Sequence, residues 1–271
     1  MPSVEAKVLT LLALAGYVLS AGVLAAARRP GREPLGKLGV HLLAGGLGLS
    51  LAVLVLRVAR GHLPTGNPFD TYNLLALLSG LVAIYLRAVH AIGRVSIALL
   101  PLAGAWSVLA IALSGAAYHD FARDVWAAAH VTLATASAVG FAAAAAGGWL
   151  YLRKHRQLRL KDPAVFQSKG PSLERLDRFV RHVLPVAFAL VTATILTGLV
   201  GAFQPQREGY FHNWVTHPKM LTAGITWLLY TLALHAAHAK RFRGRTTAVL
   251  SLVGFVLLIG VLVASMLLPM G

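Results

Sequence analysis

The chain has 271 residues, of which 57% are hydrophobic and 13% are charged, with no cysteine and a formal net charge of +16. A soluble domain carries about 25% charged residues, so this composition indicates an integral membrane protein, and the lack of cysteine excludes disulfides, thiolate ligands and CxxC redox pairs. The basic residues lie in short connections between apolar runs, with no basic stretch interleaved with aromatic residues. The charge therefore predicts membrane topology, and no nucleic-acid binding is expected.

Eight apolar segments follow one another along the chain, and each approaches or exceeds the roughly 20 residues that a membrane-spanning helix needs. They cover residues 8–27, 38–57, 71–89, 95–115, 125–152, 182–203, 217–239 and 247–268. None alternates polar and apolar residues as a barrel strand does, and helices are the remaining way to satisfy the backbone in lipid. The sequence predicts an all-α polytopic membrane protein with one transmembrane domain over residues 1–271.

The positions of lysine and arginine predict the orientation of these helices. Of the 25 basic residues, 19 share one side of the membrane, in the connections 28–37, 87–94, 153–181 and 240–246. The positive-inside rule places that side in the cytoplasm and both termini outside. We expect an uncleaved first helix, because the basic residues at 28–32 follow the first apolar run, whereas those of a signal peptide precede it. Residues 153–181 form the one long polar stretch and are predicted to be a cytoplasmic loop.

Histidine is the residue type most suited to chemistry in this chain, because polar side chains at membrane depth are costly and usually face a bundle interior or a site. The outer group is His62, His119, His130, His212 and His217, and the inner group is His41, His90, His155, His182, His235 and His238. Two imidazoles from different helices can ligate haem iron, hold a metal ion or relay protons. For one histidine alone, a hydrogen-bonded interfacial role is favoured, whereas for the whole set paired ligation is favoured.

The seventh apolar segment has histidines at both ends. His217 and His235 are 18 residues apart, which is about 27 Å of helix against a hydrocarbon core of about 30 Å. This helix is therefore predicted to present imidazole near each face of the membrane. The outer acidic residues lie in loops or at helix ends, where solvation explains them; they are Asp70, Asp120, Asp124 and Glu208.

Four stretches together resemble a known family. They are GHLPTGNPFDTYNLLALLSG (61–80), VWAAAHVTLATASAVGFAAAAAGGWLYL (125–152), SLERLDRFVRHVLPVAFALVTATILTGLVGAF (172–203) and FHNWVTHPKMLTAGITWLLYTLALHAAHAKRFRGR (211–245). The chain resembles the cytochrome c assembly superfamily of CcsA, ResC and CcmC, and within it the HemX-like eight-helix proteins. The resemblance implies an outer haem-ligand histidine at His130. It departs from the family where the usual Asp-Pro-Lys reads His217-Pro218-Lys219, and where no outer histidine follows the last segment, which puts synthase activity in doubt.

From the histidines and the resemblance we expect a protein that binds, handles or exports haem b in cytochrome c biogenesis. We expect a chaperone or transporter more than a catalyst; an enzyme would be part of a cytochrome c haem lyase or synthase. The expected outer site has His130 facing His217 or His212, with Trp126, Trp214 and Phe211 around the porphyrin and Lys219 or Arg207 on the propionates. The expected inner site has His235 with His182 or His41. The expected partners are haem, a biogenesis membrane protein or apocytochrome, and lipid of the bacterial inner (cytoplasmic) membrane.

Two other functions stay open on the sequence. One is a HemX-like, non-enzymatic membrane scaffold or regulator of haem biosynthesis that docks a partner through residues 153–181. The other is a proton-coupled transporter, which would favour interrupted helices in symmetry-related halves. Pro101 and Pro185 do interrupt apolar segments, but the sequence contains no convincing repeat.

Overall fold

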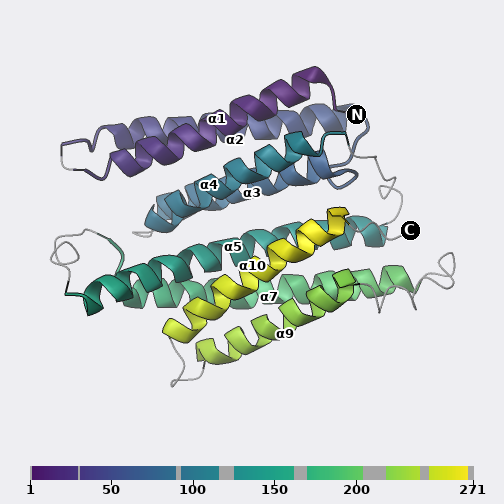
Figure 1. Ribbon diagram of the computed structural model, residues 1–271. Coiled ribbons are helices and arrows are strands. Elements are labelled where there is room, and N and C mark those ends of the chain that lie inside the picture. The colour runs from purple at the N-terminus through teal and green to yellow at the C-terminus, as the bar shows by residue number, and fades with distance from the viewer. Residues whose placement is uncertain are drawn as a thin grey trace. The chain divides into compact units, whose positions relative to one another are not determined.

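The structure is a computed structural model that describes residues 2–29, 31–89, 93–115, 125–161, 170–203, 218–238 and 244–267. Within these ranges the chain forms eight α-helices and no strand (Figure 1). The helices are α1 (Val4–Ala26), α2 (Leu35–Ala59), α3 (Pro68–Val89), α4 (Gly93–Ala112), α5 (Val125–Arg159), α7 (Leu173–Ala202), α9 (Pro218–His238) and α10 (Arg245–Leu267). The prediction of an all-α fold is confirmed.

Seven of the described helices are long and apolar enough to cross a membrane, and α9 contains the shorter apolar run Met220–Ala236. Large apolar side chains remain exposed along these helices, among them Val55, Leu196 and Leu232. Such exposure suits lipid, because lipid tails are as apolar as the side chains that face them. The chain is a multi-pass membrane protein.

Two helices extend into the stretch that was predicted to be a loop at 153–181. α5 continues to Arg159, and α7 begins at Leu173, where the Ser172 hydroxyl accepts a hydrogen bond from the Arg175 amide at 3.2 Å. Hydropathy identifies the part of a helix that lies in lipid, whereas polar turns can continue the same helix outside it. In α7 these turns contain ion pairs with i,i+4 spacing, such as Glu174 with Arg178 at 2.7 Å, which support an exposed helix.

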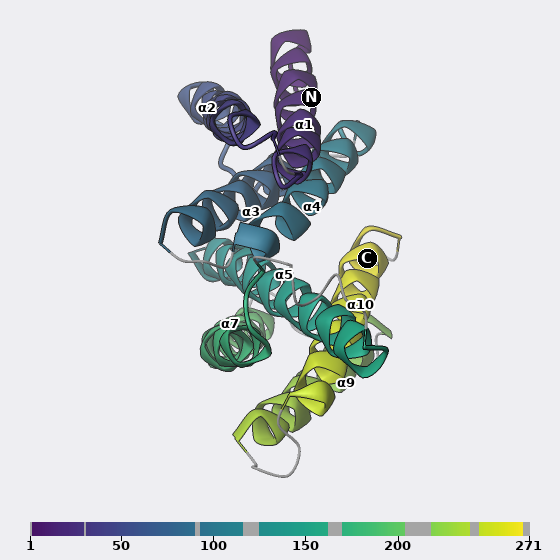
Figure 2. The same cartoon turned by 90° about the vertical axis from the view of Figure 1, so that its left-hand side faces the viewer.

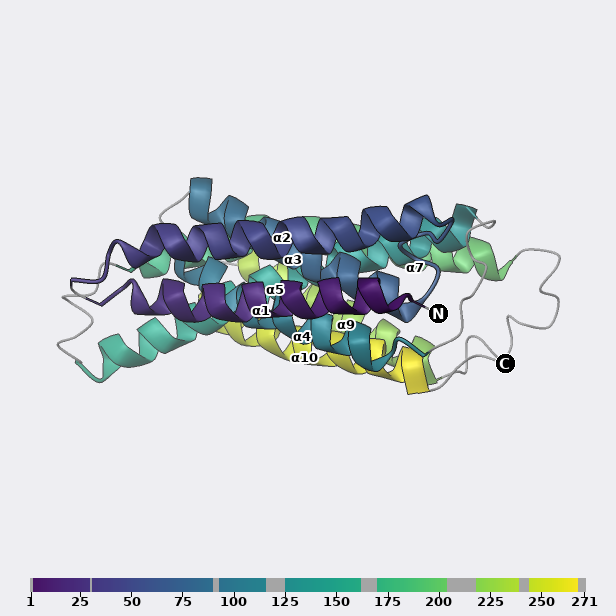
Figure 3. The ribbon, with the colours of Figure 1, turned by 90° about the horizontal axis from the view of Figure 1, so that it is seen from above.

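Contacts among residues divide the chain into two compact units, Met1–Ala128 (unit 1) and Ala129–Gly271 (unit 2); the single transmembrane domain stays a prediction. In unit 1, α1 packs on α2 and α4, and α3 packs on α4 and α2. Figure 3 shows α1 and α2 side by side along their length. Glycines bring the two helices together, since a Cβ added at Gly16 would lie 3.0 Å from the Gly46 Cα. Tyr17 Oη and Ser50 Oγ also form a hydrogen bond between them, at 2.9 Å.

In unit 2, α5 contacts α7, α9 and α10 (Figure 2). A Cβ added at Gly140 would lie 2.8 Å from a side chain of α7, and one added at Gly148 would lie 2.9 Å from the Ala248 carbonyl oxygen of α10. Phe141 of α5 stacks on Tyr230 of α9, with ring centroids 3.6 Å apart. Small residues therefore let α5 pack closely against α7 and α10. Such packing is usual in membranes, because the hydrophobic effect does not drive helices together in lipid.

Candidate functional site

His130 lies in the first third of α5, half-buried against α7. Its Nδ1 is 2.8 Å from the Thr194 carbonyl oxygen. A carbonyl only accepts hydrogen bonds, so Nδ1 carries the proton and donates it, and in the neutral ring Nε2 is the basic nitrogen. Metal-binding histidines are commonly oriented in this way, with one ring nitrogen donating to a backbone carbonyl. The contact therefore sets both the tautomer and the direction of the His130 ring.

The next turn of α7 makes room for the same ring. A Cβ added at Gly198 would lie 2.9 Å from both Cε1 and Nδ1 of His130. That is closer than Cβ atoms approach neighbours in proteins, so a larger residue would displace the imidazole. The Thr194 carbonyl also accepts a hydrogen bond from the Thr197 hydroxyl at 2.9 Å. A short stretch of α7 thus supplies both an acceptor for the ring and the space beside it.

A tryptophan joins α7 to α9 in the same unit. Trp227 Nε1 donates to the Thr192 hydroxyl at 3.0 Å, and the Trp227 ring lies 5.6 Å from the Phe188 ring, centroid to centroid. Sequence reasoning did not select Trp227, Thr192 or Gly198 as site residues. The available signal was their place in the stretches 172–203 and 211–245, which carry the family resemblance.

Two of the predicted inner histidines lie at a similar level in unit 2. α7 and α9 run in opposite directions (Figure 1) and meet at the Phe188–Trp227 ring contact. His182 precedes Phe188 by six residues and His235 follows Trp227 by eight, which correspond to about 9 and 12 Å along the helices in the same direction. Both side chains are exposed. His182 Nδ1 lies 2.7 Å from the Arg178 carbonyl oxygen, so Nε2 is again the basic ring nitrogen.

The other predicted site residues are distributed as follows. His41 lies in α2 of unit 1, exposed, with Nδ1 2.8 Å from the Lys37 carbonyl oxygen. Trp126 precedes His130 by one turn of α5 and is 44% exposed, and Lys219 is the second residue of α9. His212, His217, Phe211, Trp214 and Arg207 lie outside the described residues. Among the side chains that the structure describes, no three His, Asp or Glu residues group as metal ligands, whereas haem needs at most two axial imidazoles.

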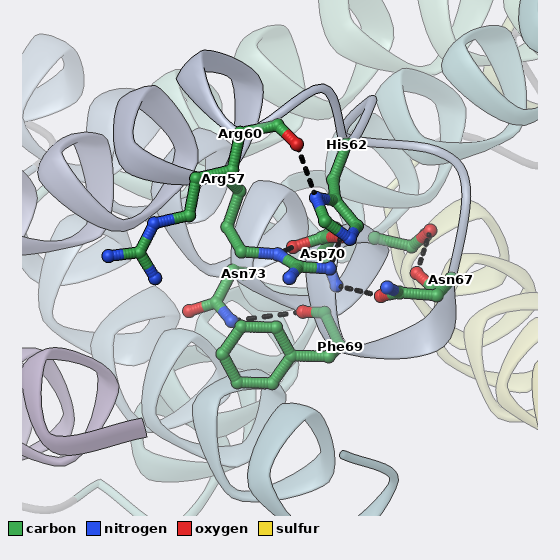
Figure 4. A network of polar contacts seen from close by, with 8 residues as sticks. Arg57, Arg60, His62, Asn67, Phe69, Asp70 and Asn73 are labelled. Carbon is green, nitrogen blue, oxygen red and sulfur yellow. Dashed lines mark hydrogen bonds and ion pairs between the residues drawn. The ribbon is translucent and has the colours of Figure 1, made fainter. Parts of the chain in front are cut away.

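Unit 1 contains a buried ion pair that the sequence interpretation missed (Figure 4). Arg57, near the end of α2, donates from Nε and Nη2 to Oδ1 and Oδ2 of Asp70, at 2.8 Å each. The two side chains are 3% and 0% exposed. The explanation of Asp70 by solvation is therefore wrong: the α2–α3 hairpin brings the last turn of one helix to the first turn of the next. The carboxylate consequently meets a guanidinium in place of water.

Further hydrogen bonds lie near this ion pair in the first turns of α3. The Asp70 amide donates to Asn67 Oδ1 at 2.8 Å, and the Thr10 hydroxyl of α1 donates to Asn73 Oδ1 at 3.2 Å. Ionised residues at membrane depth are costly unless they are paired, and the bidentate geometry gives Arg57 and Asp70 strong, charge-assisted bonds. The pair carries no net charge, and its geometry fits a role in fixing α2 to α3, whereas the Thr10–Asn73 bond joins α1 to α3.

Comparison with known proteins identifies a family. A family model described as "Cytochrome C assembly protein" matches residues 65–269. The "Cytochrome c biogenesis protein CcsA" of Prochlorococcus marinus (strain MIT 9312) is 31% identical over 113 residues, 42% of this chain and 34% of that protein. The protein of the same name from Lemna minor is 33% identical, over 39% of this chain and 33% of its own length. The one from Spinacia oleracea is also 33% identical, over 32% of this chain and 25% of its own length. The matches thus span about a quarter to a third of these relatives. No solved structure matches.

Proposed function

The chain belongs to the cytochrome c assembly protein family, and from this we propose that it binds haem b and handles or exports it during cytochrome c biogenesis. The proposed location is the bacterial inner (cytoplasmic) membrane, and the proposed partners are an apocytochrome or another biogenesis membrane protein. The family match supports the role in cytochrome c assembly. The oriented, half-buried imidazole of His130 is the observation that supports haem ligation.

The surroundings of His130 fit one axial ligand of haem iron. The hydrogen bond to the Thr194 carbonyl leaves Nε2 as the basic nitrogen, and Gly198 keeps the adjacent space clear of a side chain. An imidazole held in one tautomer is a better ligand than one that must be ordered on binding. Haem, when bound, supplies the iron porphyrin that a cytochrome needs, and this chain supplies the ligand and its orientation.

The second outer ligand in this proposal comes from the connection before α9. His217 is adjacent in sequence to Pro218, the first residue of α9, and His212 is the alternative. Trp126, Trp214 and Phe211 would shelter the porphyrin. Lys219 or Arg207 would pair with its propionates, since charge-assisted hydrogen bonds favour a cation there.

An inner haem site at His182 and His235 completes the proposal, with His41 as the alternative partner of His235. The similar level of His182 and His235 on α7 and α9, and their exposed side chains, support this pair. Haem would then pass between an inner and an outer site along the same pair of helices.

The test is the absorption spectrum of the full chain purified in detergent, oxidised and then reduced with dithionite, with haem quantified as the pyridine haemochrome. We expect a Soret band with sharp reduced α and β bands, and less haem per protein in H130A. His155, which stacks on Tyr151 in α5 at 6.0 Å, provides the control H155A, which should keep its haem. Unchanged haem in H130A would refute the outer site. A colourless wild type that takes up no added hemin would favour the scaffold function.

A further inference from the structure

Three arginines gather at one end of unit 1, where α1 and α3 end and α2 and α4 begin. Arg28 lies two residues beyond α1, Arg87 is in the last turn of α3, and Arg94 is the second residue of α4. The Arg87 guanidinium reaches the first turns of the two helices that begin there. A Cβ added at Gly36 of α2 would lie 3.6 Å from Nη2, and one added at Gly93 of α4 would lie 4.0 Å from Nη1.

The three charges are close enough to act on one another. Desolvation by the surrounding protein, and then the charges of Arg94 and Arg87, lower the pKa of Arg28 to about 10, although its side chain keeps access to solvent. Arg28 therefore remains a cation at neutral pH. Membrane topology requires only a sufficient number of basic residues on one side. It does not require residues from three separate elements to lie close enough to act on one another.

The backbone at this end adds to the positive potential. α2 and α4 both begin here, and neither has an acidic residue in its first turn. The N-terminus of a helix carries about half a positive charge and favours anions. The acidic residue of connection 27–34, Glu33, is exposed. Cations from three elements and two helix N-termini thus lie at the same end of unit 1.

We propose that the arginine cluster of Arg28, Arg87 and Arg94 binds the phosphate of an anionic phospholipid. Each arginine lies within about one turn of the end of a membrane-spanning helix, which is the depth of lipid headgroups. Guanidinium groups match phosphate oxygens in bidentate geometry, and basic pockets between transmembrane helices are suited to such headgroups.

The depth of the cluster favours a lipid over a free phosphate ion, because headgroups lie where membrane-spanning helices end. Leu38 of α2 and Tyr85 of α3, near the same helix ends, are 49% and 59% exposed, which suits contact with lipid. The proposal does not depend on haem binding.

The experiment measures binding of a fluorescent phosphatidylglycerol to the purified full chain in phosphatidylcholine nanodiscs. The triple variant R28Q/R87Q/R94Q is compared with R29Q/R32Q/K37Q, which removes three charges from the same connection and the start of α2. Each basic residue near an anionic headgroup strengthens binding about fivefold. We expect a loss of at least that size for each arginine removed from the cluster, and a clearly smaller loss in the control, whose residues contribute to the general surface charge alone.

Three outcomes would overturn the proposal: equal losses in the two triple variants, no preference of the wild type for phosphatidylglycerol over phosphatidylcholine, or full competition by inorganic phosphate, which would indicate a free-anion site. The single variant R28Q guards against misfolding, because Arg28 lies outside the helices. It should bind phosphatidylglycerol about fivefold more weakly than wild type and retain the wild-type thermal unfolding temperature in phosphatidylcholine alone. Unchanged binding in R28Q would also count against the cluster.

Discussion

Replacing Asp70 by alanine should destabilise unit 1 far more than removing the acid of an exposed ion pair. The change leaves Arg57, whose side chain is 3% exposed, without the carboxylate that accepts two hydrogen bonds at 2.8 Å. Removing one partner of a buried ion pair typically costs about 3–5 kcal/mol, because the remaining charge stays buried and uncompensated. By contrast, the Arg60–Glu5 pair is 42% and 68% exposed, and such pairs contribute at most about 1 kcal/mol.

The assay is reversible unfolding of the full chain in mixed micelles, titrated with denaturing detergent and followed by far-UV circular dichroism. The free energy of unfolding of D70A should be about 3–5 kcal/mol below that of the wild type. That of E5Q should change by at most about 1 kcal/mol. The double variant R57L/D70L should recover much of the loss, since apolar replacement of a whole buried pair is often neutral or stabilising. Equal stability of D70A and E5Q would refute the reasoning, because it would mean that water reaches Arg57.

Two further changes test the packing of unit 2. In G198A, the new Cβ would lie 2.9 Å from the His130 ring, so we expect less haem per protein in the pyridine haemochrome assay. The control is G224A, where a Cβ would meet nothing within 4 Å, and it should retain its haem. Equal haem content in the two variants would mean that the ring tolerates displacement. In W227F, loss of the 3.0 Å hydrogen bond to Thr192 should lower the free energy of unfolding by about 1 kcal/mol, and T192V in the W227F background should cost little more. Additive losses in that double variant would show that the two side chains are not coupled.

The helices could be predicted from sequence because each apolar run is long enough to span lipid, and lipid permits few alternatives for the backbone. Their ends could not, because hydropathy does not register a helix that continues into water. The start of α7 shows the difference: Leu173–Arg181 is charged, yet Ser172 caps it and Asp177 pairs with Arg181 at 3.1 Å. A helix-capping residue, Ser172, ten residues before the apolar run was the available signal.

Burial of Asp70 could not be predicted from its position alone. Arg57 ends one apolar segment and Asp70 immediately precedes the next, so each residue by itself is expected in the headgroup region. Antiparallel packing of α2 and α3 brings Arg57 and Asp70 to the same level. Opposite charges at the end of one predicted helix and the start of the next are the sequence signal for such an ion pair. Whether water is excluded depends on the packing of neighbouring side chains, which leaves the two side chains 3% and 0% exposed.

The hydrogen-bond partner of His130 in the candidate site could not be predicted from the sequence either. The family resemblance selected the histidine, but its acceptor is the backbone carbonyl of Thr194, 64 residues away. Which carbonyl faces the ring depends on the register of α5 against α7. That register is set by close contacts such as Gly140 with Ala187, and a carbonyl has no signature in sequence.

The proposed inner and outer sites share α7, and this sharing constrains how haem would move. His182 and Thr194, the acceptor of His130, are twelve residues apart on α7, or about 18 Å along the helix. One iron needs both axial nitrogens about 2 Å away, as histidine–metal bonds require, so no single iron can engage both levels. Haem would have to leave the inner pair before His130 could bind it. On this basis H130A should retain haem at His182 and His235, and only its combination with H182A should empty the protein; complete loss in H130A alone would mean that the inner pair holds none.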